Sequence, residues 1–197
     1  MGKIFCVMGK SSTGKDSIYK RILENEKLGL KRMIPYTTRP IRIKETDGVE
    51  YHFCDEAKLE ELEKAGKVIE RRDYNTEHGI WTYFTVDDGT ADDGSCMIIG
   101  TLEVYESLRD YYGAERVVPI YIFLDDGARL ARALKRERKQ AEPKYREMCR
   151  RFIADDDDFS AEKLAKAGID EAVSFENPDE EIEDTIDRVT AYIRDRM

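Results

Sequence analysis

A loop rich in glycine and hydroxyl-bearing residues lies near the start of the chain, between a short apolar run and a helical pattern. It reads Gly-Lys-Ser-Ser-Thr-Gly-Lys-Asp-Ser over residues 9–17. Glycines let such a backbone curl until successive N–H groups and the N-terminus of the next helix face a phosphate. Lys15 adds a point charge suited to the β- and γ-phosphates of ATP. The loop predicts phosphate binding, and an ordinary Gly/Ser-rich turn is the alternative.

The expected ATP contacts and the expected metal ligands overlap at the end of this loop. The usual pattern has Ser or Thr directly after the lysine, whereas here Asp16 stands there and Ser17 follows. Carboxylate and hydroxyl oxygens both suit hydrated Mg²⁺, so either residue is a candidate ligand. The loop residues predicted to bind ATP are Gly9, Ser11, Ser12, Thr13, Gly14, Lys15, Asp16 and Ser17.

Two arginines stand close together in the segment Thr-Thr-Arg-Pro-Ile-Arg, residues 37–42. The planar guanidinium fork of Arg39 or Arg42 suits bidentate recognition of a phosphate, although a solvated surface turn is the alternative. Farther along, Tyr51 lies in Asp-Gly-Val-Glu-Tyr-His-Phe, and Glu70 ends Val-Ile-Glu.

The most basic part of the chain lies between residues 135 and 151. Phosphoryl transfer needs cations near the oxygens of the moving group, and a closing lid can bring arginines there while it excludes water. A solvated helix with charges of alternating sign is the alternative. The basic side chains of this segment are therefore candidates for the phosphoryl-transfer site, together with Lys15, Arg39 and Arg42 elsewhere.

The order of these motifs resembles the guanylate kinase family. The phosphate loop, TTRxxR, DGxxYxF and VIE follow one another at matching separations, and the similarity is densest in the first eighty residues. The resemblance implies an α/β fold with a doubly wound parallel sheet, an inserted acceptor-binding subdomain and a mobile lid. It also implies phosphoryl transfer from ATP to a nucleoside monophosphate, GMP above all, with Mg²⁺.

The resemblance places the family's catalytic lid arginines at Arg151, which matches best, and at either Arg136 or Arg138 for the earlier position.

The resemblance also assigns roles on the acceptor side. Arg39, Arg42 and Tyr51 match residues that hold the acceptor's phosphate, and Glu70 matches the carboxylate that reads guanine. A carboxylate accepts two hydrogen bonds, and guanine offers two adjacent donors at N1 and N2, which adenine lacks. The alternative for Glu70 is an ion pair with Arg71 or Arg72.

Three departures from the family pattern weaken the case for guanine. Pro35 replaces a serine near guanine O6, and it cannot donate a hydrogen bond. The family's Tyr-Gly-Ser/Thr contact appears as His78-Gly79-Ile80, so His78 either serves the same anion or is an ordinary surface histidine. An Asp-x-Asp is replaced by a segment in which Thr101 or Glu103 could act through the base or Mg²⁺.

Asn177 lies in Phe-Glu-Asn-Pro near the end of the chain. It matches the family residue near the ATP adenine. The alternative is that Asn177 caps a closing helix over Pro178–Arg196, with the proline in its first turn.

The chain's 197 residues suit one domain in which strands alternate with helices. We expect strands over 3–8, 30–36, 96–99, 117–124 and 172–175. The strand over 117–124 should be followed by a highly charged helical stretch that continues to about Arg151. The segment 35–86 breaks the alternation because it is rich in strands. The predicted division is a core (1–34, 87–134 and 152–197), an acceptor-binding subdomain (35–86) and a lid (about 135–151).

Charge and composition limit the function classes. The net charge of −9 includes an uninterrupted run at Asp155–Asp158, which disfavours nucleic acid or an anionic membrane as a partner. Four widely spaced cysteines are expected to be reduced, and no signal peptide or apolar span is evident, which indicates a soluble cytoplasmic protein. The expected partners are small nucleotides, and the oligomeric state stays open.

Two other functions remain open. The chain could phosphorylate another nucleotide or a phosphorylated sugar, given Pro35 and the lost Asp-x-Asp. It could also be a non-catalytic binding module of the same fold, although such a module is expected to lose the loop lysine or the lid cations, which are present here.

Overall fold

A five-stranded sheet forms the centre of the molecule in the computed structural model, which describes residues 2–43, 45–76, 79–178 and 181–197. Its strands are β1 (Ile4–Met8), β2 (Lys31–Arg32), β7 (Cys96–Ile99), β8 (Val117–Phe123) and β9 (Ser174–Glu176). They lie in the order β2-β7-β1-β8-β9, and each neighbouring pair is parallel. The predicted doubly wound parallel sheet is confirmed.

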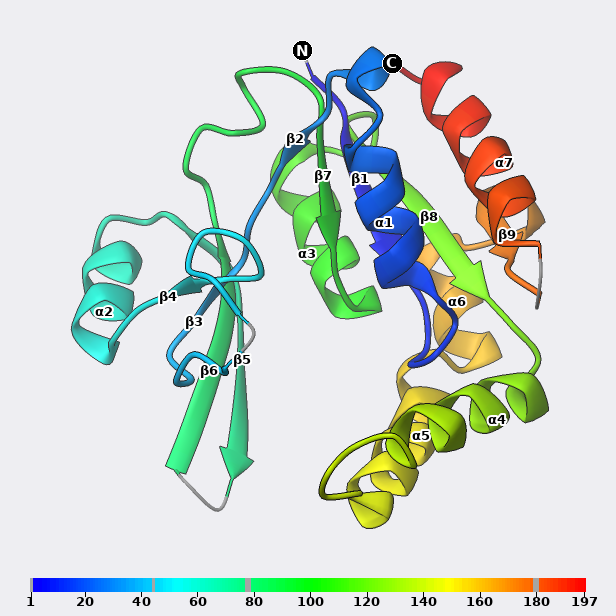
Figure 1. The fold of residues 1–197 in the computed structure, drawn as a ribbon. Coiled ribbons are helices and arrows are strands. Elements are labelled where there is room, and N and C mark those ends of the chain that lie inside the picture. Colours follow the sequence, from blue (N-terminus) through cyan, green and yellow to red (C-terminus); the bar gives the residue numbers. More distant parts are fainter. Residues whose placement is uncertain (1, 44, 77–78, 179–180) are drawn as a thin grey trace.

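Helices cover both faces of this sheet (Figure 1). On one face Phe5 and Val7 of β1 pack with α1 (Lys15–Leu23) and α7 (Ile182–Arg194). On the other, the alternate residues Ile4, Cys6 and Met8 pack with α3 (Leu102–Tyr112) and α6 (Ala161–Ala167). Strands buried on both faces are apolar throughout, which explains the continuous apolar run of β1.

A second, four-stranded sheet is built from residues 36–86. Its strands β3 (Tyr36–Thr37), β4 (His52–Phe53), β5 (Val68–Thr76) and β6 (Gly79–Val86) lie in the order β4-β3-β6-β5. Helix α2 (Glu56–Lys64) buries Leu59 and Leu62 against Phe84 of this sheet. The Asp55 side chain caps α2 by accepting from Lys58 N, as its position before the helical pattern suggests.

The charged stretch after β8 is not one helix. It divides into α4 (Asp126–Glu137) and α5 (Tyr145–Asp158), which pack against each other. Pro143 lies in the break between them. Proline disfavours a helix interior because it has no backbone N–H and because it pushes the preceding residue out of helical geometry. The Glu137 carboxylate accepts from Lys144 N and closes the connection. Helix α5 also extends past Arg151 through the whole acidic run.

Three expected elements differ in the structure. The run 30–36 is divided between β2 and β3, which belong to different sheets. The expected strand over 172–175 begins as a 3₁₀ turn (Glu171–Val173) and becomes extended only in β9. Helix α7 begins at Ile182, so Pro178 is not in its first turn. Its buried residues Ile186, Val189 and Ile193 follow a helical spacing.

The helices in the described part of the chain are too short or too polar to cross a membrane.

Candidate active site

The phosphate loop curls tightly between the end of β1 and the start of α1. Gly9, Ser12 and Gly14 have φ angles of 151°, 67° and 90°, which side chains rarely adopt. A Cβ on Gly9 would also collide with the carbonyl oxygen of Ile122 on β8. The glycines are therefore required by the backbone path, as the motif predicts.

The interior of the loop fits an anion. The Ser12 hydroxyl oxygen is buried and has no hydrogen-bond partner among the residues that the structure describes. Buried hydroxyls ordinarily have a partner, so a donor left open inside a curled loop is suited to a phosphate oxygen. The Lys15 side chain is 16% exposed, and its ammonium lies 3.8 Å from the Asp16 carboxylate. Asp16 and Ser17 are exposed in the first turn of α1, with the oxygen types that Mg²⁺ prefers.

A buried arginine supports the loop from α4. Arg129 is 0% exposed, and its Nε donates to the carbonyl of Ser11 at 3.1 Å. Its other nitrogens bind the carboxylates of Asp126 and, at 2.9 Å, Asp155, and its guanidinium stacks over Phe152. Burial raises the pKa of Asp126, but Arg129 and Lys10 more than offset it, so the net shift is downward. Arg129 thus joins the loop to both α4 and α5.

The acidic run contacts the loop directly. Asp155 accepts from the Ser11 amide at 2.8 Å and from its hydroxyl at 3.3 Å, while Asp156 binds the Lys10 ammonium at 2.6 Å. The composition analysis treated this run only as a surplus of negative charge and missed these contacts. It also missed Arg129 and Arg132, whose spacing with Arg136 places all three on one face of a helix.

Asn177 holds the far side of the loop. Its side-chain amide donates to the Thr13 carbonyl at 2.6 Å, and Arg132 donates to the carbonyl oxygens of both residues. The Asn177 Oδ1 atom is buried, and no hydrogen-bond donor contacts it in the described part of the chain. Because α7 begins only at Ile182, the alternative that Asn177 caps this helix is wrong. The residue is placed beside the phosphate loop, consistent with a role at the nucleotide.

We expect Gly14→Ala to destabilise the protein more than Gly29→Ala. Both glycines have left-handed φ angles, 90° and 58°, so each alanine costs about 1–2 kcal/mol of backbone energy. A Cβ at Gly29 meets open space, whereas one at Gly14 collides with the Asn177 amide. The lost Asn177–Thr13 hydrogen bond should add about 1 kcal/mol. Urea unfolding of both variants measures the difference, and equal losses would show that this close approach does not matter.

Arg39 follows β3, is buried against the four-stranded sheet and is already bound within the chain. Its two terminal nitrogens donate to the Glu45 carboxylate at 2.7 and 2.8 Å, and its Nε donates to the Tyr83 hydroxyl at 3.0 Å. The guanidinium also lies over the Tyr51 and Phe53 rings. Glu45 and Tyr83 are therefore site components that the sequence analysis did not identify. An acceptor phosphate would share Arg39 with Glu45.

Arg42 and Tyr51 lie beside this cluster. The Arg42 amide donates to Glu45 at 2.9 Å, while its side chain is exposed. The Tyr51 ring lies 5.5 Å from that of Tyr83. Burial, followed by the neighbouring Tyr83, raises the pKa of Tyr51, so its phenol keeps its proton at neutral pH and can donate to an anion. The structure thus brings Arg39, Arg42 and Tyr51 together.

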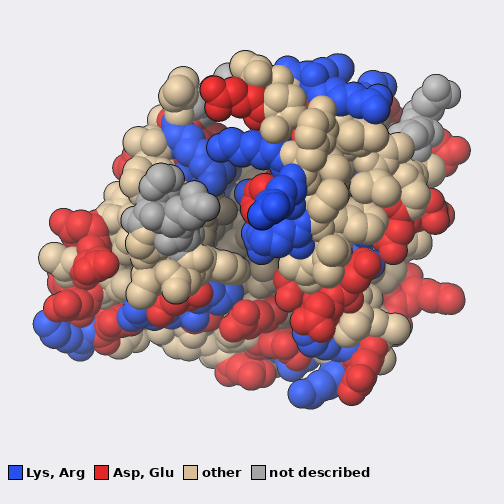
Figure 2. Space-filling view, turned by 90° about the horizontal axis from the view of Figure 1, so that it is seen from below, with Lys and Arg blue, Asp and Glu red and all other residues tan. Residues whose placement is uncertain are grey.

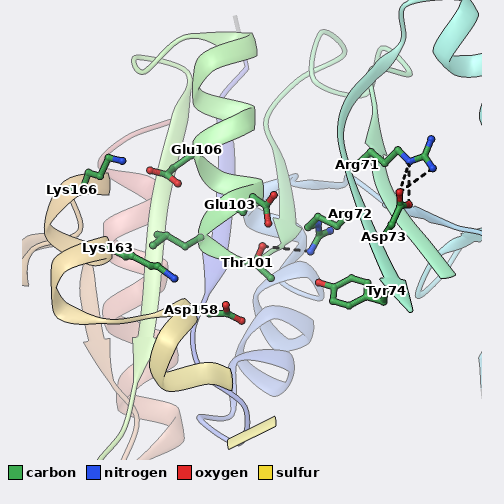
Figure 3. A pocket seen from close by; sticks show the side chains of 11 residues that line it. Arg71, Arg72, Asp73, Tyr74, Thr101, Glu103, Glu106, Asp158, Lys163 and Lys166 are labelled. Carbon is green, nitrogen blue, oxygen red and sulfur yellow. Dashed lines mark hydrogen bonds and ion pairs between the residues drawn. The ribbon is translucent and has the colours of Figure 1, made fainter. Parts of the chain in front are cut away.

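A cavity of about 640 Å³ opens between β5, the start of α3 and α6 (Figure 3). Thr101 and Glu103 line it, together with Arg72. Glu70 lies behind Arg72, because its carboxylate accepts from Arg72 Nε at 2.8 Å and from the Thr85 hydroxyl at 2.7 Å. The ion pair with Arg72 that the sequence left open is therefore present.

The arginines predicted for the lid are at the surface. Arg136 and Arg138 are exposed, and Arg151 donates to Glu147 at 2.8 Å. Arg150 and Arg151 hold the pKa of Glu147 at about 2.

Basic side chains gather around a hollow on the face shown in Figure 2. His78, the remaining candidate, lies outside the described residues.

Comparison with known proteins identifies the family. A family model described as guanylate kinase matches residues 1–161. The chain belongs to the guanylate kinase family. A guanylate kinase from Mycoplasma pneumoniae is 38% identical over 77 residues, 39% of this chain and 32% of that protein. One from Methylobacillus flagellatus is 31% identical over 120 residues, 61% of this chain and 54% of that protein. The chain thus spans about a third to a half of these relatives.

The structural likeness to the guanylate kinase family extends over nearly the whole chain. A crystal structure of guanylate kinase from Anaplasma phagocytophilum matches with a TM-score of 0.63, covering 98% of this chain and 85% of that one. The sequence identity is 19%, so this comparison concerns the fold. Within that fold, Glu45, Arg129 and Asp155 are among the residues whose contacts the motif comparison alone did not identify.

Proposed function

We propose that the chain transfers the γ-phosphoryl group of ATP to GMP, giving ADP and GDP, with Mg²⁺. The observation that carries this proposal is the curled phosphate loop, where the Ser12 hydroxyl has no partner among the described residues and the Lys15 side chain is mostly buried. The family match over residues 1–161 supports the same activity. Arg39 and Arg42, beside the four-stranded sheet, would bind the phosphate of the acceptor. A P–O bond to the ADP leaving group breaks and a new one forms to an oxygen of the acceptor phosphate.

The chain's own residues would act by position and charge. Lys15 stabilises charge on the donor phosphates, and the lid arginines Arg136, Arg138 and Arg151 complete the site as it closes. Arg39, Arg42 and Tyr51 orient the attacking phosphate, which is already an anion and needs no general base. Asp16 or Ser17 would help to hold Mg²⁺, which when bound would neutralise part of the negative charge of the phosphates.

The proposed division of labour follows the two sheets. The core around the five-stranded sheet binds ATP, the segment 35–86 binds the acceptor, and the lid lies near residues 135–151. Asp155 and Asp156, just after the lid, bind Ser11 and Lys10 of the phosphate loop, which supports a lid attached to the loop at this end while the part bearing Arg136 and Arg138 closes.

The decisive experiment measures ADP release from Mg·ATP with GMP, dGMP, AMP, CMP, UMP and dTMP as acceptors. We expect strong preference for GMP and dGMP. A panel without turnover would direct the search to other phosphorylated acceptors, including phosphorylated sugars. Calorimetric binding of Mg·ATP without turnover on any acceptor would instead support a non-catalytic binding module.

A further inference from the structure

The guanine-reading role that the family assigns to Glu70 is changed by its neighbour Arg72. Glu70 Oε2 accepts from Arg72 Nε at 2.8 Å, and Oε1 accepts from the Thr85 hydroxyl at 2.7 Å and from Arg72 Nη2 at 3.3 Å. The side chain of Glu70 is only 4% exposed. Both carboxylate oxygens are therefore engaged inside the protein, and neither presents an open edge to a base.

Arg72, not Glu70, faces the cavity. It lines the space between β5 and α3, with Thr101 and Glu103 opposite (Figure 3). A guanidinium has five N–H donors. The bonds to Glu70 use the Nε side of the fork, and Nη1 makes one long contact of 3.4 Å with the Thr101 hydroxyl. Of the described residues, these two are its hydrogen-bond acceptors, which leaves one N–H on each terminal nitrogen.

Two parallel N–H donors suit a ligand edge with two neighbouring acceptors. Guanine presents such an edge at O6 and N7, and arginine binds it bidentately. Adenine replaces O6 with an amino group, which is a donor and would face a guanidinium donor. Hypoxanthine keeps both O6 and N7 and lacks only the 2-amino group of guanine.

The charge of the cavity favours an uncharged group there. Its lining carries four cationic and four carboxylate side chains: Arg71, Arg72, Lys163, Lys166, Asp73, Glu103, Glu106 and Asp158. A phosphate would be drawn to an excess of positive charge, as at Arg39 and Arg42, whereas balanced charges suit a neutral nucleobase.

We infer that Arg72 reads the O6 and N7 acceptors of a 6-oxopurine and that Glu70 is the positioning residue that holds its guanidinium in place. This inference rests on the proposed function and narrows its acceptor class to 6-oxopurine nucleotides. Its consequence differs from direct readout by a carboxylate. With Glu70 reading N1 and N2, loss of the 2-amino group would be penalised, but with Arg72 reading O6 and N7 it is not.

The test compares GMP, IMP and AMP in two measurements on the full chain: calorimetric binding, and kcat and KM for ADP release from Mg·ATP. We expect IMP to be used within about tenfold of GMP, and both at least about 100-fold better than AMP. IMP binding or turnover about 100-fold below GMP would overturn the inference. Binding of GMP and IMP without ADP release would refute the proposed function and leave the readout supported. Binding of neither would refute both.

Variants separate the roles of the two residues. Arg72→Met should raise KM for GMP and IMP by about 10- to 100-fold, because one bidentate base contact is worth that factor, while AMP use stays unchanged. Methionine also leaves the buried Glu70 carboxylate without its partner, so a second variant is needed. Arg72→Lys keeps the positive charge and removes only the planar fork, and the same increase in KM is expected. Unchanged KM for GMP in Arg72→Lys would overturn the inference.

A positioning role for Glu70 predicts a specific kinetic signature. Glu70→Gln should raise the KM for GMP and the KM for IMP by equal factors. It should leave kcat and the KM for Mg·ATP unaltered, because only the orientation of Arg72 is disturbed. A selective loss of GMP relative to IMP would show that Glu70 reads the 2-amino group itself. Lys64→Met, which breaks an exposed pair with Glu60 on α2, is the control and should change none of these values.

Discussion

Replacing Lys15 with alanine should lower the rate of phosphoryl transfer by about 100- to 1000-fold, the usual cost of removing one preorganised charge from a transition state. The Lys15 ammonium is mostly buried at the end of the phosphate loop, where its interaction with developing charge is screened less than at the surface. The measurement is kcat and KM for Mg·ATP at saturating GMP, with melting temperature as the check on folding.

Lys20→Ala is the matched control for this prediction. Lys20 lies on the same helix, α1, but its side chain is 71% exposed and faces Glu24 at 3.8 Å. It should retain full turnover. Near-normal activity of Lys15→Ala, in a folded protein, would contradict the proposed mechanism, because no other described residue places a lysine at the start of α1.

Replacing Arg129 with methionine should reduce the free energy of unfolding by about 3 kcal/mol, the lower end of the range for breaking a buried ion pair. The lower end applies because Asp126 and Asp156 are half exposed and can be resolvated, whereas the Asp155 side chain is 15% exposed. The loop should also lose its support at the Ser11 carbonyl, so KM for Mg·ATP should rise. Urea unfolding followed by circular dichroism measures the first effect, and steady-state kinetics the second.

Arg150→Met tests whether burial is the cause. Arg150 binds Glu147 at 2.8 Å on the neighbouring helix α5, but its side chain is 65% exposed. Exposed pairs contribute less than about 1 kcal/mol, so this variant should be close to the parent protein. Equal losses in the two variants would contradict the assignment. A double-mutant cycle of Arg129→Met with Asp155→Asn should show non-additive losses, because the two side chains are in contact.

The core fold was predictable because its signals are local. Apolar runs ending at glycine mark the buried strands, and helical spacing marks α1, α3 and α7. The failures were local conflicts resolved by tertiary contacts. The run at 30–36 has a strand pattern throughout, yet it separates at Pro35 into strands of two different sheets. The charged stretch after β8 has helical propensity throughout, yet it turns back at Pro143 so that α5 can reach the phosphate loop.

The phosphate loop, its lysine and the arginine pair at 39 and 42 were determined by the sequence alone, because each is a contiguous motif whose geometry depends on its own backbone. The partners of these residues were decided only by the tertiary structure. Arg129 and Asp155 meet Ser11 across 118 and 144 residues of chain, and no spacing rule links residues so far apart.

The same distinction holds on the acceptor side. The sequence shows Glu70 and Arg72 two positions apart on a strand, so their side chains share one face. Whether Glu70 is open to a ligand or enclosed depends on Thr85, from the neighbouring strand, and on Thr101, from the core. Those contacts turn the carboxylate inward, because a buried charge is costly unless it is paired and hydrogen-bonded. The guanidinium of Arg72 is left at the cavity wall.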